Sequence, residues 1–138
     1  MAGVDRVACA LYDAEEDKLR TFIHSTRRGH AITGYEYRLA DSYSLSKLAQ
    51  SGDFRVLDDI AAAIRSNTSH SKWLQEQGYR SSFTVPTYEN GVLLGFVFFD
   101  STQTRTFTSQ VQRDLVLYSS LIRRSAKGAI LVSPTFLR

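Results

Sequence analysis

The sequence lacks several features that mark whole classes of protein. It has one cysteine, Cys9, so an intrachain disulfide is impossible, and this favours a reducing compartment. No apolar run is long enough to cross a bilayer, and residues 1–5 have neither the basic nor the apolar segment of a signal peptide. We therefore expect a cytoplasmic protein without membrane insertion.

Long blocks of one charge are also missing. The formal net charge is +3 and the pI is about 9.2, but the basic residues are spread along the chain. Arg27-Arg28 and Arg123-Arg124 are only pairs, and cations near a helix C-terminus commonly oppose the helix dipole. A nucleic-acid-binding surface needs a clustered basic stripe, so we expect no nucleic-acid partner.

Motifs for catalysis, metal binding and phosphate binding are absent as well. His24, His30 and His70 lack the spacing of metal ligands and have no cysteine or glutamate at a suitable distance. The glycines match neither GxGxxG nor a GK[ST] motif. Cys9 lies within an apolar strand pattern, where a buried thiol behaves as a small hydrophobe. The sequence predicts no enzyme and no metal site, and it identifies no cofactor.

The chain has the length and composition of a single globular domain. Its 138 residues are 43% hydrophobic and 22% charged, which is ordinary for a protein with a packed core. We assign residues 1–126 to one domain and residues 127–138 to a C-terminal linker or truncation tail. Because the chain ends on an apolar segment around Phe136, we expect it to be a fragment of a longer protein.

Asn90 and Gly91 give the clearest structural signal, a β-hairpin with a two-residue turn. A type I′ turn needs positive φ at both central positions, which Asn and Gly tolerate. Counting outward from the turn predicts four cross-strand pairs: Glu89 with Val92, Thr87 with Leu94, Val85 with Phe96, and Phe83 with Phe98. This register gives one face bulky apolar side chains and leaves Ser82, Thr84 and Gly95 on the other.

Hydrophobic periodicity elsewhere predicts alternating strands and helices. The expected elements are strands over 4–12, 19–25 and 54–57, a helix over 42–50 that stops at Gly52, a turn over 60–64, and a brief helix over 72–77. The last helix begins at Thr108 or Ser109 and carries an apolar stripe until a stop at residues 126–128. Hairpins at both ends of the chain favour an α+β fold with an antiparallel sheet.

Short motifs along the chain stand in a characteristic order: Arg80-Ser81, Val85-Pro86, Asn90-Gly91, Leu94-Gly95, Ser101 and Phe107-Thr108. In this order they resemble the C-terminal half of GAF domains, and the resemblance extends over residues 4–124. It implies a central antiparallel sheet of five or six strands with helices on both faces. A PAS domain, which is similar in architecture, stays open as an alternative.

The resemblance implies a sensory module that binds a small effector and signals through its C-terminal helix to an output domain in a longer chain. Cyclic-nucleotide-binding members carry Asn-Lys where this chain has Asp100-Ser101, so such a ligand is not predicted. Bilin-carrying members attach the chromophore to a later cysteine, and sulfoxide-reducing members use several cysteines. Cys9 alone matches neither pattern, so we expect a non-catalytic domain.

Small side chains on one sheet face suggest space for a ligand. Ala8 and Ala10 are expected beside Ser82 and Thr84, with aromatic residues of the loops as a roof. Close packing of a helix against these small residues is the open alternative. The candidate ligand-binding residues are Tyr35, Tyr37, Tyr43, His70, Trp73, Ser82 and Thr84.

The last helix has a second apolar strip formed by Leu117 and Leu121. A helix that is apolar on two sides usually contacts two partners. We expect these residues to form a homodimer interface, similar to the parallel dimers of many GAF-containing sensors. The competing hypothesis of a different class is a ligand-free structural or dimerisation module, whose pocket is filled by its own side chains.

Overall fold

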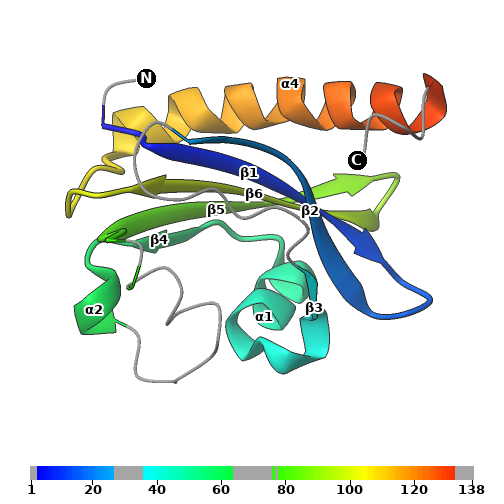
Figure 1. The fold of residues 1–138 in the computed structure, drawn as a ribbon, viewed down its shortest axis with the longest axis horizontal. Coiled ribbons are helices and arrows are strands. Elements are labelled where there is room, and N and C mark those ends of the chain that lie inside the picture. The colour runs from blue at the N-terminus through cyan, green and yellow to red at the C-terminus, as the bar shows by residue number, and fades with distance from the viewer. Residues whose placement is uncertain (1–2, 27–35, 64–75, 77, 133–138) are drawn as a thin grey trace.

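Six antiparallel strands form the middle layer of the protein (Figure 1). The computed structural model describes residues 3–26, 36–63, 76 and 78–132. The strands are β1 (Arg6–Asp13), β2 (Lys18–Thr26), β3 (Glu36–Arg38), β4 (Arg55–Leu57), β5 (Ser81–Glu89) and β6 (Val92–Ser101). Their order across the sheet is β3-β2-β1-β6-β5-β4, with the two three-residue strands at the edges. The predicted α+β fold is confirmed.

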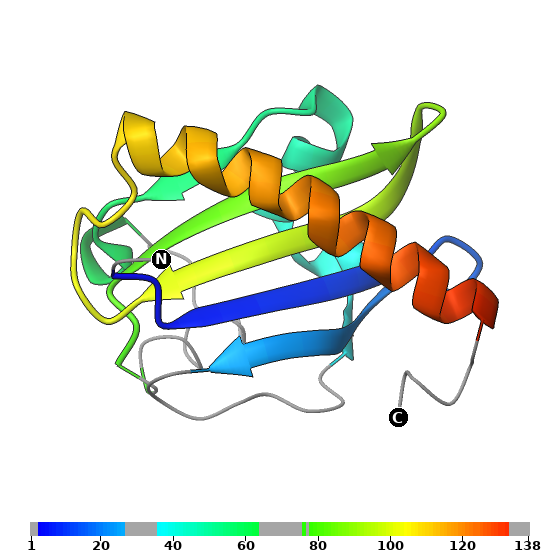
Figure 2. The same ribbon diagram turned by 90° about the horizontal axis from the view of Figure 1, so that it is seen from above.

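Helices lie on both faces of this sheet, as expected. The 3-10 turn η1 (Leu39–Asp41) and the helices α1 (Tyr43–Ser51) and α2 (Ile60–Ala63) lie on one face, and α4 (Ser109–Val132) crosses the other (Figures 1 and 2). No helix in the described part of the chain is long and apolar enough to span a bilayer.

Local capping sets the ends of α1. The Ser42 hydroxyl accepts a hydrogen bond from the Leu45 N–H at 3.3 Å, which satisfies one free donor of the first turn. Gly52 ends the helix in the left-handed conformation at φ 76°, and its N–H donates to the Leu48 carbonyl. The predicted helix over 42–50 and its glycine stop are confirmed.

α4 begins where the sequence predicts but ends later. Thr108 is its N-cap, because the Thr108 hydroxyl accepts from the Val111 N–H at 3.4 Å. The helix then continues to Val132, so the predicted stop at residues 126–128 is wrong. A single glycine such as Gly128 costs a helix only about 1 kcal/mol relative to alanine, which neighbouring helix formers offset. The domain boundary at residue 126 stays a prediction.

Two other predictions have different outcomes. The sequence predicts no strand between residues 25 and 54, but residues 36–38 form the short edge strand β3, which pairs with β2. The helix predicted over 72–77 falls almost entirely outside the described residues. The predicted strands over 4–12, 19–25 and 54–57 correspond to β1, β2 and β4, and are confirmed.

A β-bulge in β6 changes the register of the hairpin. The turn is as predicted, with Asn90 at φ 52° and Gly91 at φ 79°. Tyr88 then pairs with Leu93 but Thr87 pairs with Gly95, so Leu94 is an extra residue in β6. Every residue of β6 beyond the bulge therefore faces the side opposite to the one that the sequence register predicted.

The predicted pairs beyond the bulge are wrong by one residue. Phe83 lies opposite Phe99 rather than Phe98, and Val85 lies opposite Val97 rather than Phe96. The rings of Phe96 and Phe98 consequently lie on the face where small side chains were expected. This correction decides how much of that face is left for a ligand.

Two large hydrophobic cores lie one on each face of the sheet, and a smaller cluster in the described part of the chain joins Leu57, Ile60 and Tyr79. Phe83 is central to the core under α4, where its ring centroid lies 6.2 Å from that of Phe99 and 6.0 Å from that of Phe107. Leu115 of α4 is fully buried against this aromatic group. The core under α1 joins strand and helix side chains: Ala8, Ala10, Leu19, Leu39, Leu45, Leu48, Phe96 and Phe98.

Gly95 fixes the bulge because β1 runs immediately against it. A Cβ at Gly95 would lie 1.9 Å from the Ala10 carbonyl oxygen, which is a backbone atom and cannot rotate away. Its φ of 158° is also one that other residues rarely adopt. The approach of β1 and β6 at this point therefore requires glycine.

We predict that Gly95→Ala lowers the unfolding free energy by at least about 3 kcal/mol, because β1 and β6 must separate locally. Gly91→Ala is the matched control: it also has positive φ, but a Cβ there meets nothing within 4 Å. We expect it to cost about 1 kcal/mol. Urea unfolding of the two variants measures the difference, and equal losses would contradict the steric role of Gly95.

Candidate functional site

The sheet face toward α1 divides into two parts of different chemistry. In the first part, Phe96 and Phe98 pack with Leu45 and Leu48 of α1, and Ala8 is fully buried among them. The small side chains of β1 thus leave the room that the large side chains of β6 and α1 occupy, and no ligand is needed to fill it. The alternative of helix packing is correct for this part of the face.

The second part adjoins the first, toward the start of β1 and the end of β6, and most of its residues are polar. Cross-strand pairing places Arg6, Asp100, Ser82 and Leu57 in one row across β1, β6, β5 and β4. Strand alternation puts Thr84 on the same face as Ser82, two residues along β5. This polar row is our candidate site.

A chain of hydrogen bonds joins three elements at Thr84. Arg55 of β4 donates from Nη2 to Thr84 Oγ1 at 3.0 Å and from Nη1 to Ser44 Oγ of α1 at 2.9 Å. Thr84 is fully buried, so its orientation is fixed by this contact. Since the hydroxyl oxygen accepts from Arg55, the hydroxyl hydrogen of Thr84 is available to donate elsewhere.

Ser82 stands out because its hydroxyl is buried without a hydrogen bond. The residue is 2% exposed, and no group in the described part of the chain bonds its Oγ. A buried hydroxyl without a partner costs about 1 to 3 kcal/mol. Such a group is a reason to expect a ligand atom at this position.

Arg6 and Asp100 form a buried ion pair beside Ser82. Both side chains are 2% exposed, and Arg6 Nη1 donates to Asp100 Oδ2. Burial raises the pKa of the Asp100 carboxyl, while the charge of Arg6 opposes that rise by favouring the carboxylate. Next to the pair, Asp5 accepts from the Thr102 N–H at 2.8 Å and from the Thr102 hydroxyl at 2.9 Å, which ties the start of β1 to the loop after β6.

The structure brings together two of the seven residues proposed for the ligand site, Ser82 and Thr84. Tyr43 lies at the start of α1 with its side chain 79% exposed, and the Lys47 ammonium is 5.8 Å from its ring centroid. Tyr37 belongs to β3, where it pairs with Leu19. Three more candidates lie outside the described residues: Tyr35, His70 and Trp73.

Sequence reasoning missed Arg55, Arg6 and Asp100 as neighbours of these hydroxyls. Arg6 and Asp100 are 94 residues apart in the chain, and no sequence pattern linked them. Arg55 was placed in a strand, but the pairing of that strand was not predicted. The signal that could have exposed this site was Gly95 inside a strand pattern, which indicates a bulge.

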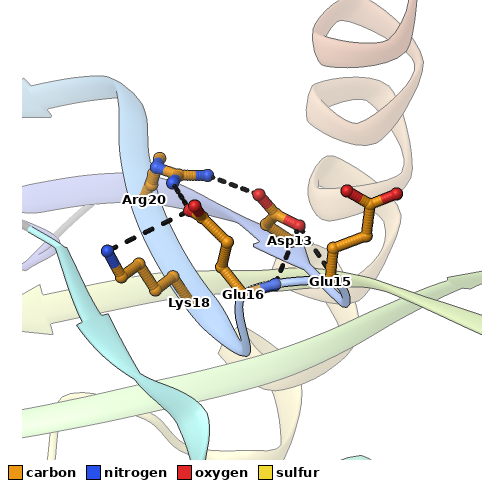
Figure 3. A network of polar contacts seen from close by, with 5 residues as sticks. All are labelled: Asp13, Glu15, Glu16, Lys18 and Arg20. Atoms are coloured by element: carbon orange, nitrogen blue, oxygen red, sulfur yellow. Dashed lines mark hydrogen bonds and ion pairs between the residues drawn. The ribbon is translucent and has the colours of Figure 1, made fainter.

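A second polar cluster lies at the β1–β2 turn but is satisfied internally (Figure 3). Arg20 bonds Asp13 at 2.9 Å and Glu16 at 2.5 Å, and Asp13 also accepts from the N–H groups of Glu15 and Glu16. The Arg20 hydrogen bond lowers the pKa of the Asp13 carboxyl. These contacts shape the turn, and within the described ranges no group of acidic, histidine or cysteine side chains could hold a metal ion.

The chain is similar to known proteins both in sequence, through a family model, and in fold. The family model described as GAF domain matches residues 1–124. None of the curated proteins matches the sequence closely enough to count as a relative.

Solved structures share this fold at low sequence identity. The phycocyanobilin-bound GAF domain of a cyanobacterial phytochrome is 16% identical, with a TM-score of 0.73 over 96% of this chain and 80% of its own. The GAF domain of Acinetobacter phosphoenolpyruvate-protein phosphotransferase is 15% identical, with a TM-score of 0.68 over 94% and 74%. The type II free methionine-R-sulfoxide reductase of Thermoplasma acidophilum is 18% identical, with a TM-score of 0.61 over 82% and 71%.

We predict that Arg6→Met lowers the unfolding free energy by about 3 kcal/mol or more, because Asp100 is left buried without its counter-ion. The double variant Arg6→Met with Asp100→Leu recovers most of this loss, since apolar residues often replace a buried pair without cost.

Arg20→Met is the control for this experiment. It breaks ion pairs of similar geometry in which the Arg20 side chain is 43% exposed, so we expect a loss below about 1 kcal/mol. Urea unfolding measures all three variants. A double variant no more stable than Arg6→Met would mean that the charge of Asp100 is not the cause.

Proposed function

Because the chain belongs to the GAF domain family, we propose that it is a non-catalytic sensory domain that binds a small effector on the sheet face carrying Ser82 and Thr84. The observation that carries the proposal is the buried Ser82 hydroxyl without a hydrogen-bond partner among the described residues. It lies next to Asp100 of the Arg6–Asp100 pair and two residues along β5 from Thr84, which is opposite Phe98 of the packed part. Recognition of a small molecule would use such a set of convergent polar groups.

Cys9, the one cysteine of the sequence, is not suited to nucleophilic catalysis. Cys9 is buried on the face toward α4, and burial raises the pKa of its thiol to about 12. A thiolate is the nucleophilic form, so this side chain is not suited to attack at neutral pH. The similarity to the Thermoplasma reductase is therefore treated as one of fold.

Signal relay would run from the site to α4 by two short routes. Within β5, Ser82 and Thr84 alternate with Phe83, whose ring packs on Phe107 just before α4. From β4, the Asp58 carbonyl accepts from the Arg105 N–H at 2.9 Å and so holds the loop that leads into α4. An effector that favours one placement of this loop would shift α4, and we propose that α4 passes the change to an output domain in a longer, cytoplasmic protein.

A ligand-free structural module is the second candidate, and two observations favour it. Phe96 and Phe98 fill part of the face that was expected to be open. Leu117 and Leu121 of α4 are 72% and 59% exposed, which is unusual for large apolar side chains that have no partner. In this case the role of the domain would be dimerisation through α4.

The effector proposal is tested by native mass spectrometry of the purified protein and by a thermal-shift screen of nucleotides, amino acids and haem. A retained molecule, or a ligand at 100 times its Kd, should stabilise the protein by about 2.7 kcal/mol and raise Tm by several degrees. Ser82→Met should remove this effect while circular dichroism shows a folded protein. Equal binding by folded Ser82→Met, or no ligand at all, would favour the structural module.

For the homodimer, we predict that the protein dimerises with rising concentration and that Leu117→Glu with Leu121→Glu makes it monomeric, because two charges would be buried in the interface. Val92→Glu is the matched control, since Val92 is an exposed apolar residue, 64% exposed, in the β5–β6 hairpin. Light scattering after size exclusion gives the masses. A monomer at high concentration, or an equal effect of Val92→Glu, would refute this interface.

A further inference from the structure

The polar row of the sheet has hydrogen-bond donors that point to a particular class of ligand. Ser82 and Thr84 lie on one face of β5, two residues and thus about 6.6 Å apart along the strand. The Ser82 hydroxyl lacks a partner in the described part of the chain, and the Thr84 hydroxyl oxygen already accepts from Arg55. Both hydroxyl hydrogens are therefore available to one acceptor group placed between them.

Arg55 places a positive charge beside these two hydroxyl donors. Its guanidinium lies 3.0 Å from Thr84 Oγ1, and its other terminal nitrogen bonds Ser44 at 2.9 Å. A side chain held at both ends in this way keeps its positive charge beside the hydroxyls. Hydrogen bonds from such a site to an ionised acceptor are about twice as strong as those to a neutral one.

Asp100 is the group that would act against an anion, since it lies opposite Ser82 in β6. Its carboxylate is bonded by Arg6 within a pair whose members are both 2% exposed. The charges of both Arg6 and Arg55 favour the Asp100 carboxylate against the effect of burial. Two guanidinium groups thus face one carboxylate in this part of the sheet, which leaves a net positive charge beside the hydroxyls.

We propose that the effector carries an oxyanion, a carboxylate or a phosphate, which accepts hydrogen bonds from Ser82 and Thr84 beside Arg55. The inference rests on the proposed function and specifies the chemistry of the group bound at that site. The two oxygens of a carboxylate, or two of a phosphate, can reach both hydroxyls at once.

Three benzene-ring fragments of similar size but different charge test the charge that the site prefers. Benzoate, benzamide and benzylamine are titrated separately into the 138-residue protein at constant ionic strength, with inorganic phosphate as a fourth probe. Amide resonances of β5 are followed by NMR. We expect benzoate and phosphate to shift the Ser82 and Thr84 resonances, and benzamide and benzylamine to bind at least about tenfold more weakly.

Variants assign the effect to these hydroxyls. Ser82→Ala should weaken benzoate binding at least about tenfold without lowering Tm, because it removes a hydroxyl that has no partner. The matched control is Ser81→Ala, on the opposite face of β5, whose hydroxyl donates to the Gln103 carbonyl at 2.5 Å. It should lower Tm and leave benzoate binding unchanged. Thr84→Val should also weaken benzoate binding because it removes the hydroxyl. Thr84→Ser keeps the hydroxyl and should bind benzoate as well as the unchanged protein does.

Other outcomes of these titrations would contradict either the preference for an oxyanion or the role of the Ser82 hydroxyl. If benzamide or benzylamine shifts the β5 resonances as strongly as benzoate, the site binds ligands but the oxyanion inference is wrong. If Ser82→Ala lowers Tm as Ser81→Ala does and leaves benzoate binding intact, the hydroxyl is structural and the inference is wrong. If no probe shifts β5, the oxyanion inference is wrong, whereas the proposed function is decided separately by the mass-spectrometry and thermal-shift experiments.

Discussion

The close approach of β1 to β6 at Gly95 is the constraint on which the rest of the structure depends. At this point the Ala10 carbonyl takes the space that a Cβ would occupy, and Leu94 is displaced as the extra residue of the bulge. The bulge turns the remainder of β6 over, because side chains in a strand alternate between faces. As a result, the Phe99 side chain lies in the core under α4 and the Phe98 side chain lies in the core under α1.

The reversal of β6 divides the sheet face toward α1 into a part packed with apolar side chains and a part that carries polar groups. With Phe96 and Phe98 turned toward α1, the first part of that face becomes an ordinary hydrophobic core. Next to Phe98 on this face lie polar groups and a small apolar cluster of Leu57, Ile60 and Tyr79; the polar groups are Arg6, Arg55, Ser82, Thr84 and Asp100. A face that was expected to be uniformly spacious is instead divided into a packed part and a part that can form hydrogen bonds.

β5 connects the two sides of the sheet mechanically. Ser82 and Thr84 belong to the candidate site, while Phe83, between them, stacks on Phe99 and Phe107 under α4. A displacement of this strand is felt on both faces because each packed core resists deformation. Under the proposed function, β5 would be the rigid element between the candidate site and α4, whereas the chemistry of recognition would depend on the residues at that site.

Sequence alone determined the features that depend on near neighbours in the chain. The Asn90-Gly91 turn, the Ser42 and Gly52 ends of α1 and the start of α4 follow from local backbone preferences, so they were predictable. The order of motifs also identified the family. Locally, Ser82 and Thr84 were chosen correctly as neighbours on one face.

Only the tertiary structure decided what lies beside those hydroxyls. The bulge at Leu94 depends on contact with β1, more than 80 residues away in the chain, and no local preference encodes that contact. The Arg6–Asp100 pair and the Arg55–Thr84 bond arise in the same way, from strands that meet only in the folded sheet. Local patterns fix which residues form a strand, but the faces and partners of those residues are set by strands that are distant in sequence.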